Sequence, residues 1–393
     1  MKRRHSPNEY PRVAVCVDQF QSHGRGAMRG IANYVDTHGP WLLLLDPLAD
    51  SSYPKGRSEN WRGDGILTYV QDRPRALRLR RRGIPTVELF GYRDDNILPL
   101  VSHDDLAIGR LAAGHLIERN FRHLAFCGYR QASWSDRRRL GFVEHATAAK
   151  CPSPNCLSFE RRQRFVDRER MEEELVRWLK ELPEPVGLMA CSDNLAQAIL
   201  DACLRAKLAV PNTVAVIGVN NDEEICRLSN PSLSSVILNS ERVGFEGARL
   251  LDKLMRRRIK PDGISPLLFA PLGVATRRST EATAVQDRLI ADAMRLIQER
   301  ACHGLSADNL LQHFRISRST FYDRFHEALG RSPSHEILRV RLDRAKSLLS
   351  QTLLPLKRIA EQVGFDDPNY LHAAFKREVG VNPGEYRLQH SSR

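Results

Sequence analysis

The sequence predicts a two-lobed α/β domain followed by an all-α domain that contains two helix-turn-helix units in tandem. Two observations support the α/β part: short apolar strands alternate with helical stretches, and this alternation restarts near residue 123. A third observation supports the all-α part. Residues 306–329 and 356–379 each have the pattern of a short helix, a tight turn and a longer helix.

The chain has 393 residues, which is enough for two or three domains. We expect an N-terminal tail at residues 1–10, a two-lobed domain at 11–280 and a helical domain at 281–393, joined by a linker at 282–285. The tail is basic but has no apolar signal core, and no run approaches the ~18 apolar residues of a membrane span. We therefore expect a cytoplasmic protein with no membrane partner.

The elements of the α/β part follow in order. Before residue 123 we expect strands at 13–17, 41–45, 65–69, 84–90 and 99–102, and helices at 25–36, 74–82 and 104–119. From residue 123 we expect strands at 123–128, 186–190, 214–218 and about 267–274, and helices at 135–149, 168–181, 194–207 and 241–257. Strands are short apolar runs, and helices carry apolar residues at three- and four-residue steps. Helix 241–257 is also a candidate dimer face.

The two longer helices of the C-terminal region repeat one design. Their apolar residues recur on one face: Phe321, Phe325 and Leu329 in the first, and Leu371, Phe375 and Val379 in the second. Ser317 can cap the first helix, and Asp367 followed by Pro368 supplies a cap and a first-position proline for the second. Gly364 supplies the preceding turn. Cap and turn residues at matching positions in the two units favour tandem recognition helices over a simple helical bundle with solvated charges.

A recognition helix presents its first two turns to base edges in the major groove, and two such helices on one spacer would enter grooves about 34 Å apart. The predicted partner is therefore double-stranded DNA. The base-facing candidates are Ser319, Tyr322 and Asp323 in the first unit and Asn369 and His372 in the second. Asn can pair with adenine and Asp can accept from cytosine. The phosphate-facing candidates are Arg318, Arg324, Lys376 and Arg377.

The last hundred residues resemble the AraC/XylS-type DNA-binding domain. The matching motifs are Ile359-Ala360, Val363-Gly364-Phe365, Phe375-Lys376-Arg377, Gly380, Asn382-Pro383 and Tyr386-Arg387. Many members carry Arg where this chain has Asp323, with the basic residue here one position later at Arg324.

Residues 11–280 resemble the sugar-sensing core of LacI/GalR-type repressors and periplasmic sugar-binding proteins. The matching motifs are His103-Asp104-Asp105, Gly109, Ala112-Ala113, His115-Leu116, Arg138, Gly141-Phe142, Ser192-Asp193, Val210-Pro211, Val216-Ile217-Gly218, Pro231 and Leu233-Ser234-Ser235. The combination is similar to the regulators of xylose operons. It implies a sugar-responsive activator with xylose as the lead effector, acting as a homodimer with RNA polymerase. The family usually places Asp where this chain has Asn220.

Parallel α/β lobes bind ligands beyond the carboxyl ends of their strands. The effector-binding candidates at such ends are Asp18, Phe20, His103, Asp104, Trp134, Arg138, Asp193 and Asn220, and Arg25 could also reach the cleft. Asp, Asn and Arg can engage neighbouring sugar hydroxyls, and a ring can cover the sugar's apolar face. For any single residue, a role in a loop or a cap is an equal alternative.

Gly24, Gly26 and Gly30 follow the first strand, and Asp46 ends the second, which resembles a dinucleotide fingerprint. Six residues separate the strand from Gly24, however, so close helix packing is the favoured interpretation.

Other patterns do not indicate chemistry. The eight cysteines form no CxxC pair, and no nucleophile elbow, P-loop, HExxH or paired-carboxylate pattern occurs. We expect no catalytic residue, cofactor or metal. The net charge of +13 suits a nucleic-acid partner, although residues 281–393 hold 17 basic and 14 acidic residues, and an Arg-rich run lies at 73–82. The alternative is a two-lobed sugar- or nucleotide-processing enzyme with a helical appendage.

Overall fold

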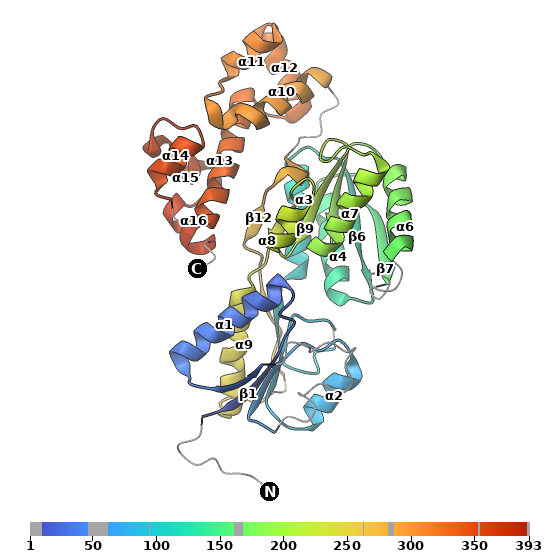
Figure 1. Ribbon diagram of the computed structural model, residues 1–393, viewed down its shortest axis with the longest axis vertical. Coiled ribbons are helices and arrows are strands. Elements are labelled where there is room, and N and C mark those ends of the chain that lie inside the picture. Colours follow the sequence, from blue (N-terminus) through green and yellow to red (C-terminus); the bar gives the residue numbers. More distant parts are fainter. Residues whose placement is uncertain are drawn as a thin grey trace.

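The computed structural model describes residues 10–45, 62–93, 95–160, 168–261, 263–281, 287–352 and 354–390. Its α/β part forms two lobes, each built on a six-stranded sheet, and its C-terminal part is helical (Figure 1). This architecture is the predicted fold class. The expected linker at 282–285, most of the tail and Asp46 lie outside the described residues.

The sheet of lobe 1 has the order β11-β5-β4-β3-β1-β2, and all its pairings are parallel. The strands are β1 (Arg12–Cys16), β2 (Leu42–Leu45), β3 (Gly65–Thr68), β4 (Thr86–Leu89), β5 (Leu100–His103) and β11 (Leu267–Phe269). Its helices are α1 (Ser22–His38), α2 (Arg73–Arg81) and α9 (Ser240–Met255). The three central strands β3, β4 and β5 are buried along their whole length, as expected where helices cover both faces of a parallel sheet.

The sheet of lobe 2 has the order β12-β10-β9-β8-β6-β7, and β12 is antiparallel to β10. The strands are β6 (His123–Arg130), β7 (Asn155–Glu160), β8 (Val186–Ala190), β9 (Val214–Val219), β10 (Ser234–Ile237) and β12 (Gly273–Ala275). Its helices are α3 (Asp105–Ile117), α4 (Ser133–Ala148), α6 (Arg168–Glu181), α7 (Asp193–Ala206) and α8 (Glu223–Leu228).

The chain passes between the lobes three times, after β5, after β10 and after β11. The restart of the alternation near residue 123 is not the start of the second lobe, which begins with α3, because α3 packs on α4 and on strands of the second sheet. The single strand expected at 267–274 is two three-residue strands, one in each sheet. Strands β7 and β10 and helix α8 were not predicted.

Helices α1 and α9 lie against each other with their backbones in close contact. A Cβ atom at Gly30 would lie 1.9 Å from the carbonyl oxygen of Glu241, and one at Gly244 would lie 2.0 Å from that of Ala27. Lobe 2 has the same kind of close helix contact at a glycine, because a Cβ at Gly109 of α3 would lie 2.0 Å from the carbonyl oxygen of Arg138 in α4. Of the glycines after the first strand, Gly26 and Gly30 therefore serve helix packing, whereas a Cβ at Gly24 would meet the carbonyl oxygen of Asp18 in the loop before α1 (1.7 Å).

We expect Gly30→Ala to destabilise the protein by about 1–3 kcal/mol, because the added methyl group must push two helix backbones apart. The shift in the urea unfolding midpoint measures this cost. Gly114→Ala is the control, since a Cβ there meets first the side chain of His145, at 3.3 Å. Equal stability of the two variants would contradict the packing role of Gly30.

The C-terminal part contains α10 (Arg288–Arg300), α11 (Ala307–Phe314), α12 (Arg318–Leu329), α13 (Pro333–Gln351), α14 (Leu356–Gln362), α15 (Pro368–Val379) and α16 (Pro383–His390). Two separate cores form around Phe321 and Phe325 in the first unit and around Phe375 in the second. Helix α13 joins both cores, with Ile337 in the first and Leu349 in the second. In Figure 1 this part (orange to red) lies beside lobe 2 and strand β12.

The predicted helix starts are confirmed. Ser317 accepts a hydrogen bond from the backbone N–H of Thr320 (3.2 Å), and Asp367 accepts one from that of Asn369 (2.8 Å).

Across the described ranges, no helix is long and apolar enough to cross a membrane.

Candidate functional site

A cavity of about 160 Å³ lies between the two lobes, where the carboxyl ends of their strands meet. Lobe 1 contributes Asp18, Gln21, His23, Tyr69, Phe90, Tyr92 and His103 to its lining. Lobe 2 and the crossing after β10 contribute Asp105, Tyr129, Trp134, Arg138, Ser192, Asn194, Asn220 and Leu238. Five of the predicted effector residues are in this set: Asp18, His103, Trp134, Arg138 and Asn220.

Aromatic rings form much of the cavity wall. Tyr92 lies between Tyr69 and Trp134, with ring centroids 4.4 Å and 6.0 Å away. Phe90 stacks on His103 at 5.4 Å. The indole Nε1 of Trp134 is buried and has no hydrogen-bond partner among the described residues. Because a buried N–H rarely stays unpaired, this indole marks Trp134 as a candidate ligand contact.

The polar side chains of the wall are held in fixed orientations. Arg138 donates from Nε to Asp105 (2.8 Å) and from Nη1 to the carbonyl oxygen of Cys191 (2.6 Å), and its guanidinium lies 4.8 Å from the Trp134 ring centroid. Burial lowers the pKa of His103 well below its usual range, and the nearby His23 and Arg138 lower it further. His103 is therefore neutral at pH 7, with one donor and one acceptor nitrogen, and its Nε2 already lies 3.2 Å from Ser240 Oγ.

The other four predicted effector residues do not line the cavity. Phe20 is 73% exposed. Asp104 caps α3 by accepting from the backbone N–H of Ala107 (2.9 Å), and the next residue, Asp105, lines the cavity in its place. The roles of Asp104 and Asp105 depend on where α3 begins. A shift of that start by one residue would change which of the two lines the cavity.

Arg25 joins the two lobes at the rim of the cleft. Its Nη2 lies 3.1 Å from Asp222 Oδ2 on the loop after β9. The backbone N–H of Ser22 donates to the same carboxylate, and Asn194 Nδ2 donates to Gln21 Oε1. The donor–acceptor distance is 3.2 Å in both hydrogen bonds. These bonds join α1 and the loop before it to lobe 2, so they stabilise a closed arrangement of the lobes.

Asp193 is fully buried and supports the loop that carries Asn220. It accepts from Ser235 Oγ (2.6 Å) and from the backbone N–H of Asp222 (2.8 Å), and burial raises the pKa of Asp193 to about 6. Asn220 and Asn221 both have left-handed φ angles, of 116° and 48°. Such backbone strain is typical of ligand sites, and Asn tolerates it better than most residues.

The second recognition helix, α15, has one buried and one free face. Leu371 and Phe375 are buried, whereas Asn369, His372 and Lys376 are exposed at three- and four-residue spacing. These three side chains therefore share a stripe that can enter a major groove. Arg377 is also exposed, and its Nε lies 2.8 Å from Glu378.

The first recognition helix, α12, exposes Ser319 and Asp323 and half-buries Tyr322. The guanidinium of Arg318 lies 5.6 Å from the Tyr322 ring centroid and 3.1 Å from Asp308.

Arg324 binds Asp287 through two bonds of 2.7 Å, and Asp287 caps α10. This ion pair connects α12 to the start of α10. Because the guanidinium of Arg324 already has a carboxylate partner, the pair argues against the predicted contact with a DNA phosphate.

The sequence matches a periplasmic binding protein-like domain family over residues 113–280 and a helix-turn-helix domain family over residues 310–389. A xylose operon regulatory protein of Haemophilus influenzae is 30% identical over 389 residues, which cover 97% of this chain and 99% of that protein. The chain belongs to the family of xylose operon regulatory proteins.

Two further relatives of this family match over nearly the whole length. The xylose operon regulatory protein of Escherichia coli K12 is 27% identical over 384 residues, 96% of each chain. The solved structure of the xylose-binding transcription activator xylR has a TM-score of 0.64 and 26% identity, and the match covers 98% of this chain and 100% of that one. This member of the xylose operon regulatory family is therefore a sugar-responsive transcription regulator, and the enzyme alternative is set aside.

Several cavity residues of this family member were not predicted from the sequence. Tyr69 directly follows β3, and Phe90 and Tyr92 follow β4, so the rule that ligands bind beyond strand ends applied to these strands as well. Asn194 lies in the first turn of α7, which the same rule would place at the cleft. His23 lies in the first turn of α1, after β1, so the same rule covers it as well.

Proposed function

We propose that this regulator binds a single pentose, with xylose as the lead candidate, in the cavity between its lobes. The observation that carries the proposal is the ring-lined cavity of about 160 Å³, whose wall includes Trp134 with an indole N–H that has no partner among the described residues. Pockets for drug-sized ligands are larger, roughly 300–1,000 Å³, so the volume favours one sugar ring over a disaccharide. Aromatic rings match the apolar faces of a sugar, and Asp18, Arg138 and Asn220 match its hydroxyl groups.

The DNA-binding part of the proposal assigns base contacts to Ser319, Tyr322, Asp323, Asn369 and His372. Phosphate contacts are assigned to Arg318, Lys376 and Arg377. The exposed stripe on α15 supports this assignment. We further propose a homodimer that works in the cytoplasm and activates transcription with RNA polymerase, with the sensor at residues 11–280 and the DNA-binding domain at 281–393. Sedimentation of the purified chain tests the dimer.

A thermal-shift screen against pentoses and hexoses tests the ligand. A sugar at a hundred times its dissociation constant should stabilise the protein by about 2.7 kcal/mol. D-Xylose is expected to give the largest shift. A panel in which no monosaccharide raises the melting temperature would contradict a sugar site in the cleft.

Trp134→Phe is expected to weaken sugar binding by about 0.5–1.5 kcal/mol, because it keeps the ring but removes the N–H. Isothermal titration with D-xylose measures the change. Trp178→Phe is the matched control, because that indole N–H already donates to Asn155 (2.8 Å) and lies outside the cavity lining. If Trp134→Phe leaves the affinity unchanged, the indole does not contact the sugar.

A further inference from the structure

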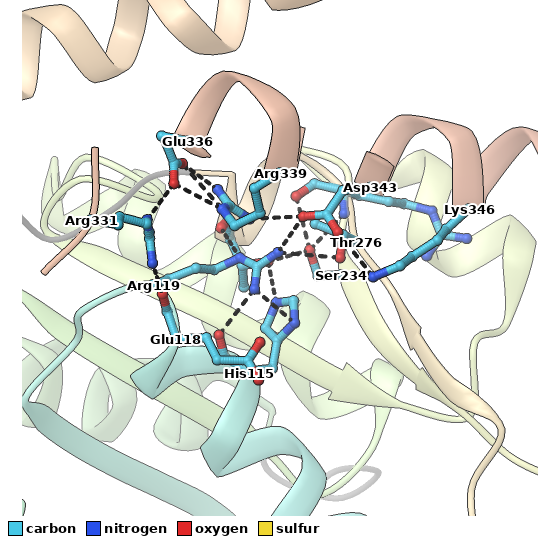
Figure 2. Close-up of polar contacts among 12 residues, drawn as sticks. His115, Glu118, Arg119, Ser234, Thr276, Arg331, Glu336, Arg339, Asp343 and Lys346 are labelled. Atoms are coloured by element: carbon cyan, nitrogen blue, oxygen red, sulfur yellow. Dashed lines mark hydrogen bonds and ion pairs between the residues drawn. The ribbon is translucent and has the colours of Figure 1, made fainter. Parts of the chain in front are cut away.

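The sensor and the DNA-binding domain meet around one buried arginine. Arg119 follows the last turn of α3 and has a side chain that is 5% exposed (Figure 2). Its Nη2 lies 3.3 Å from Asp343 of α13, its Nε donates to the carbonyl oxygen of Thr280 (3.1 Å), and its Nη1 donates to that of His115 (3.1 Å). One side chain thus joins α3, the segment after β12 and the DNA-binding domain.

Arg119 and Asp343 are both charged in this contact. Burial lowers the pKa of Arg119 to about 10, so the guanidinium remains charged at pH 7. Burial alone would raise the pKa of Asp343, but Arg339, Arg119 and Lys346 outweigh it and hold that pKa below its usual range. A buried cation without its carboxylate is strongly disfavoured. The pair therefore opposes any movement that separates α13 from the end of α3.

The contact extends to the first recognition helix. Asn120 Nδ2 donates to the carbonyl oxygen of Ala328 in the last turn of α12 (2.7 Å). Arg331, just beyond that helix, donates to the carbonyl oxygen of Glu118 (3.1 Å). Figure 2 shows Arg331 and Arg339 converging on the buried Glu336, so the start of α13 is fixed at the same place. A shift of the end of α3 would therefore move α12 and α13.

Helix α3, whose end carries this contact, begins at the ligand cavity. Asp105, the first residue of α3, lines the cavity and binds Arg138. At ~1.5 Å per residue, the 13 residues of α3 form a rod of about 20 Å from the cavity to the cluster around Arg119. Thr276, whose Oγ1 accepts from Arg119 Nη2 (3.4 Å), directly follows β12, the strand reached by the third crossing between the lobes. The end of α3 and the segment after β12 therefore meet at Arg119.

We propose that the Arg119–Asp343 pair couples the sugar cleft to the DNA-binding domain, so that the effect of sugar on DNA affinity depends on it. This inference rests on the proposed function. Arg119 is a positioning residue here, since it contacts neither the cavity nor the exposed stripe of α15. Coupling of this kind typically changes affinity about 5- to 150-fold and is reciprocal between the two ligands.

The test uses the full chain and an operator fragment that the wild type selects from a random-sequence DNA pool. DNA affinity is titrated at fixed salt with and without saturating D-xylose, and D-xylose affinity is titrated on the free protein. The variants are Arg119→Gln and Asp343→Asn. The control is Arg110→Gln, also in α3, which breaks an exposed pair with Glu144 of α4 (2.8 Å).

We expect the wild type and Arg110→Gln to show the same sugar effect on DNA affinity, at least about 5-fold. In Arg119→Gln and Asp343→Asn the effect should fall to within about twofold of unity, with D-xylose affinity unchanged within about threefold and the operator still preferred. If Arg119→Gln does not fold, Asp343→Asn decides, because its amide is of the same size. A sugar effect in Asp343→Asn equal to that of the wild type would overturn the inference. A wild type that binds operator DNA but ignores sugar would instead overturn the proposed function, and the inference with it.

Discussion

Alanine at both Asn369 and His372 is expected to remove roughly 2–6 kcal/mol of binding to operator DNA, since each base contact contributes about 1–3 kcal/mol. This corresponds to a loss of about 30-fold to 10⁴-fold, limited below by non-specific binding. Both side chains are exposed on the stripe of α15, whereas Leu371 and Phe375 on the opposite face hold the helix in place. The loss should therefore come from lost contacts and not from unfolding.

Competition gel shifts at fixed salt, with operator and random DNA, measure this loss. The double variant should bind random DNA as the wild type does, because its phosphate contacts remain. Lys376→Met is the comparison, since loss of a phosphate contact weakens binding to all sequences and reduces the salt slope by about one. If the double variant still prefers the operator by the wild-type ratio, α15 does not read bases through these residues.

Phe375→Ala is expected to destabilise the second helix-turn-helix unit by about 3–5 kcal/mol. The ring is fully buried, contacts Tyr386 with centroids 5.3 Å apart, and belongs to a core that is separate from that of the first unit, although α13 and the short helix Ala301–His303 contact both. A loss of that size is a large part of the stability of a small domain, so the unit should unfold at physiological temperature. Operator binding should be lost, and D-xylose binding should persist because the lobes have their own cores.

Calorimetry should show this as a separate, lowered transition, with the transition of the lobes still raised by D-xylose. Leu388→Ala is the control, since that leucine is 86% exposed in the same unit. One shared transition that falls for the whole chain would show that the second unit does not unfold on its own.

Local patterns were sufficient to predict most elements of the fold. Strand runs such as residues 214–218 and caps such as Ser317 and Asp367 depend on neighbouring residues alone, and the structure has them where they were expected. The assignment of α3 to lobe 2 could not be predicted in this way. It depends on a contact between Gly109 and the backbone of α4 that no local pattern reports.

The site was predictable to the extent that strand ends determine it. Asp18, Trp134 and Asn220 follow strands and line the cavity. Asp104 and Asp105 are adjacent, so their roles depend on the first turn of α3, which a sequence locates only to within a few residues. The partners of Arg119 and Arg324 come from segments that are distant in the chain or across a linker, and no spacing rule relates them.

One measurement tests the account most directly: the anisotropy of a labelled operator duplex titrated with the full-length regulator at constant ionic strength, in the absence and in the presence of D-xylose. We predict binding that is at least ~10³ tighter than to scrambled duplex and that changes about 5-fold or more on addition of the pentose. Superimposable curves with and without every monosaccharide tried, or equal affinity for operator and scrambled DNA, would contradict it.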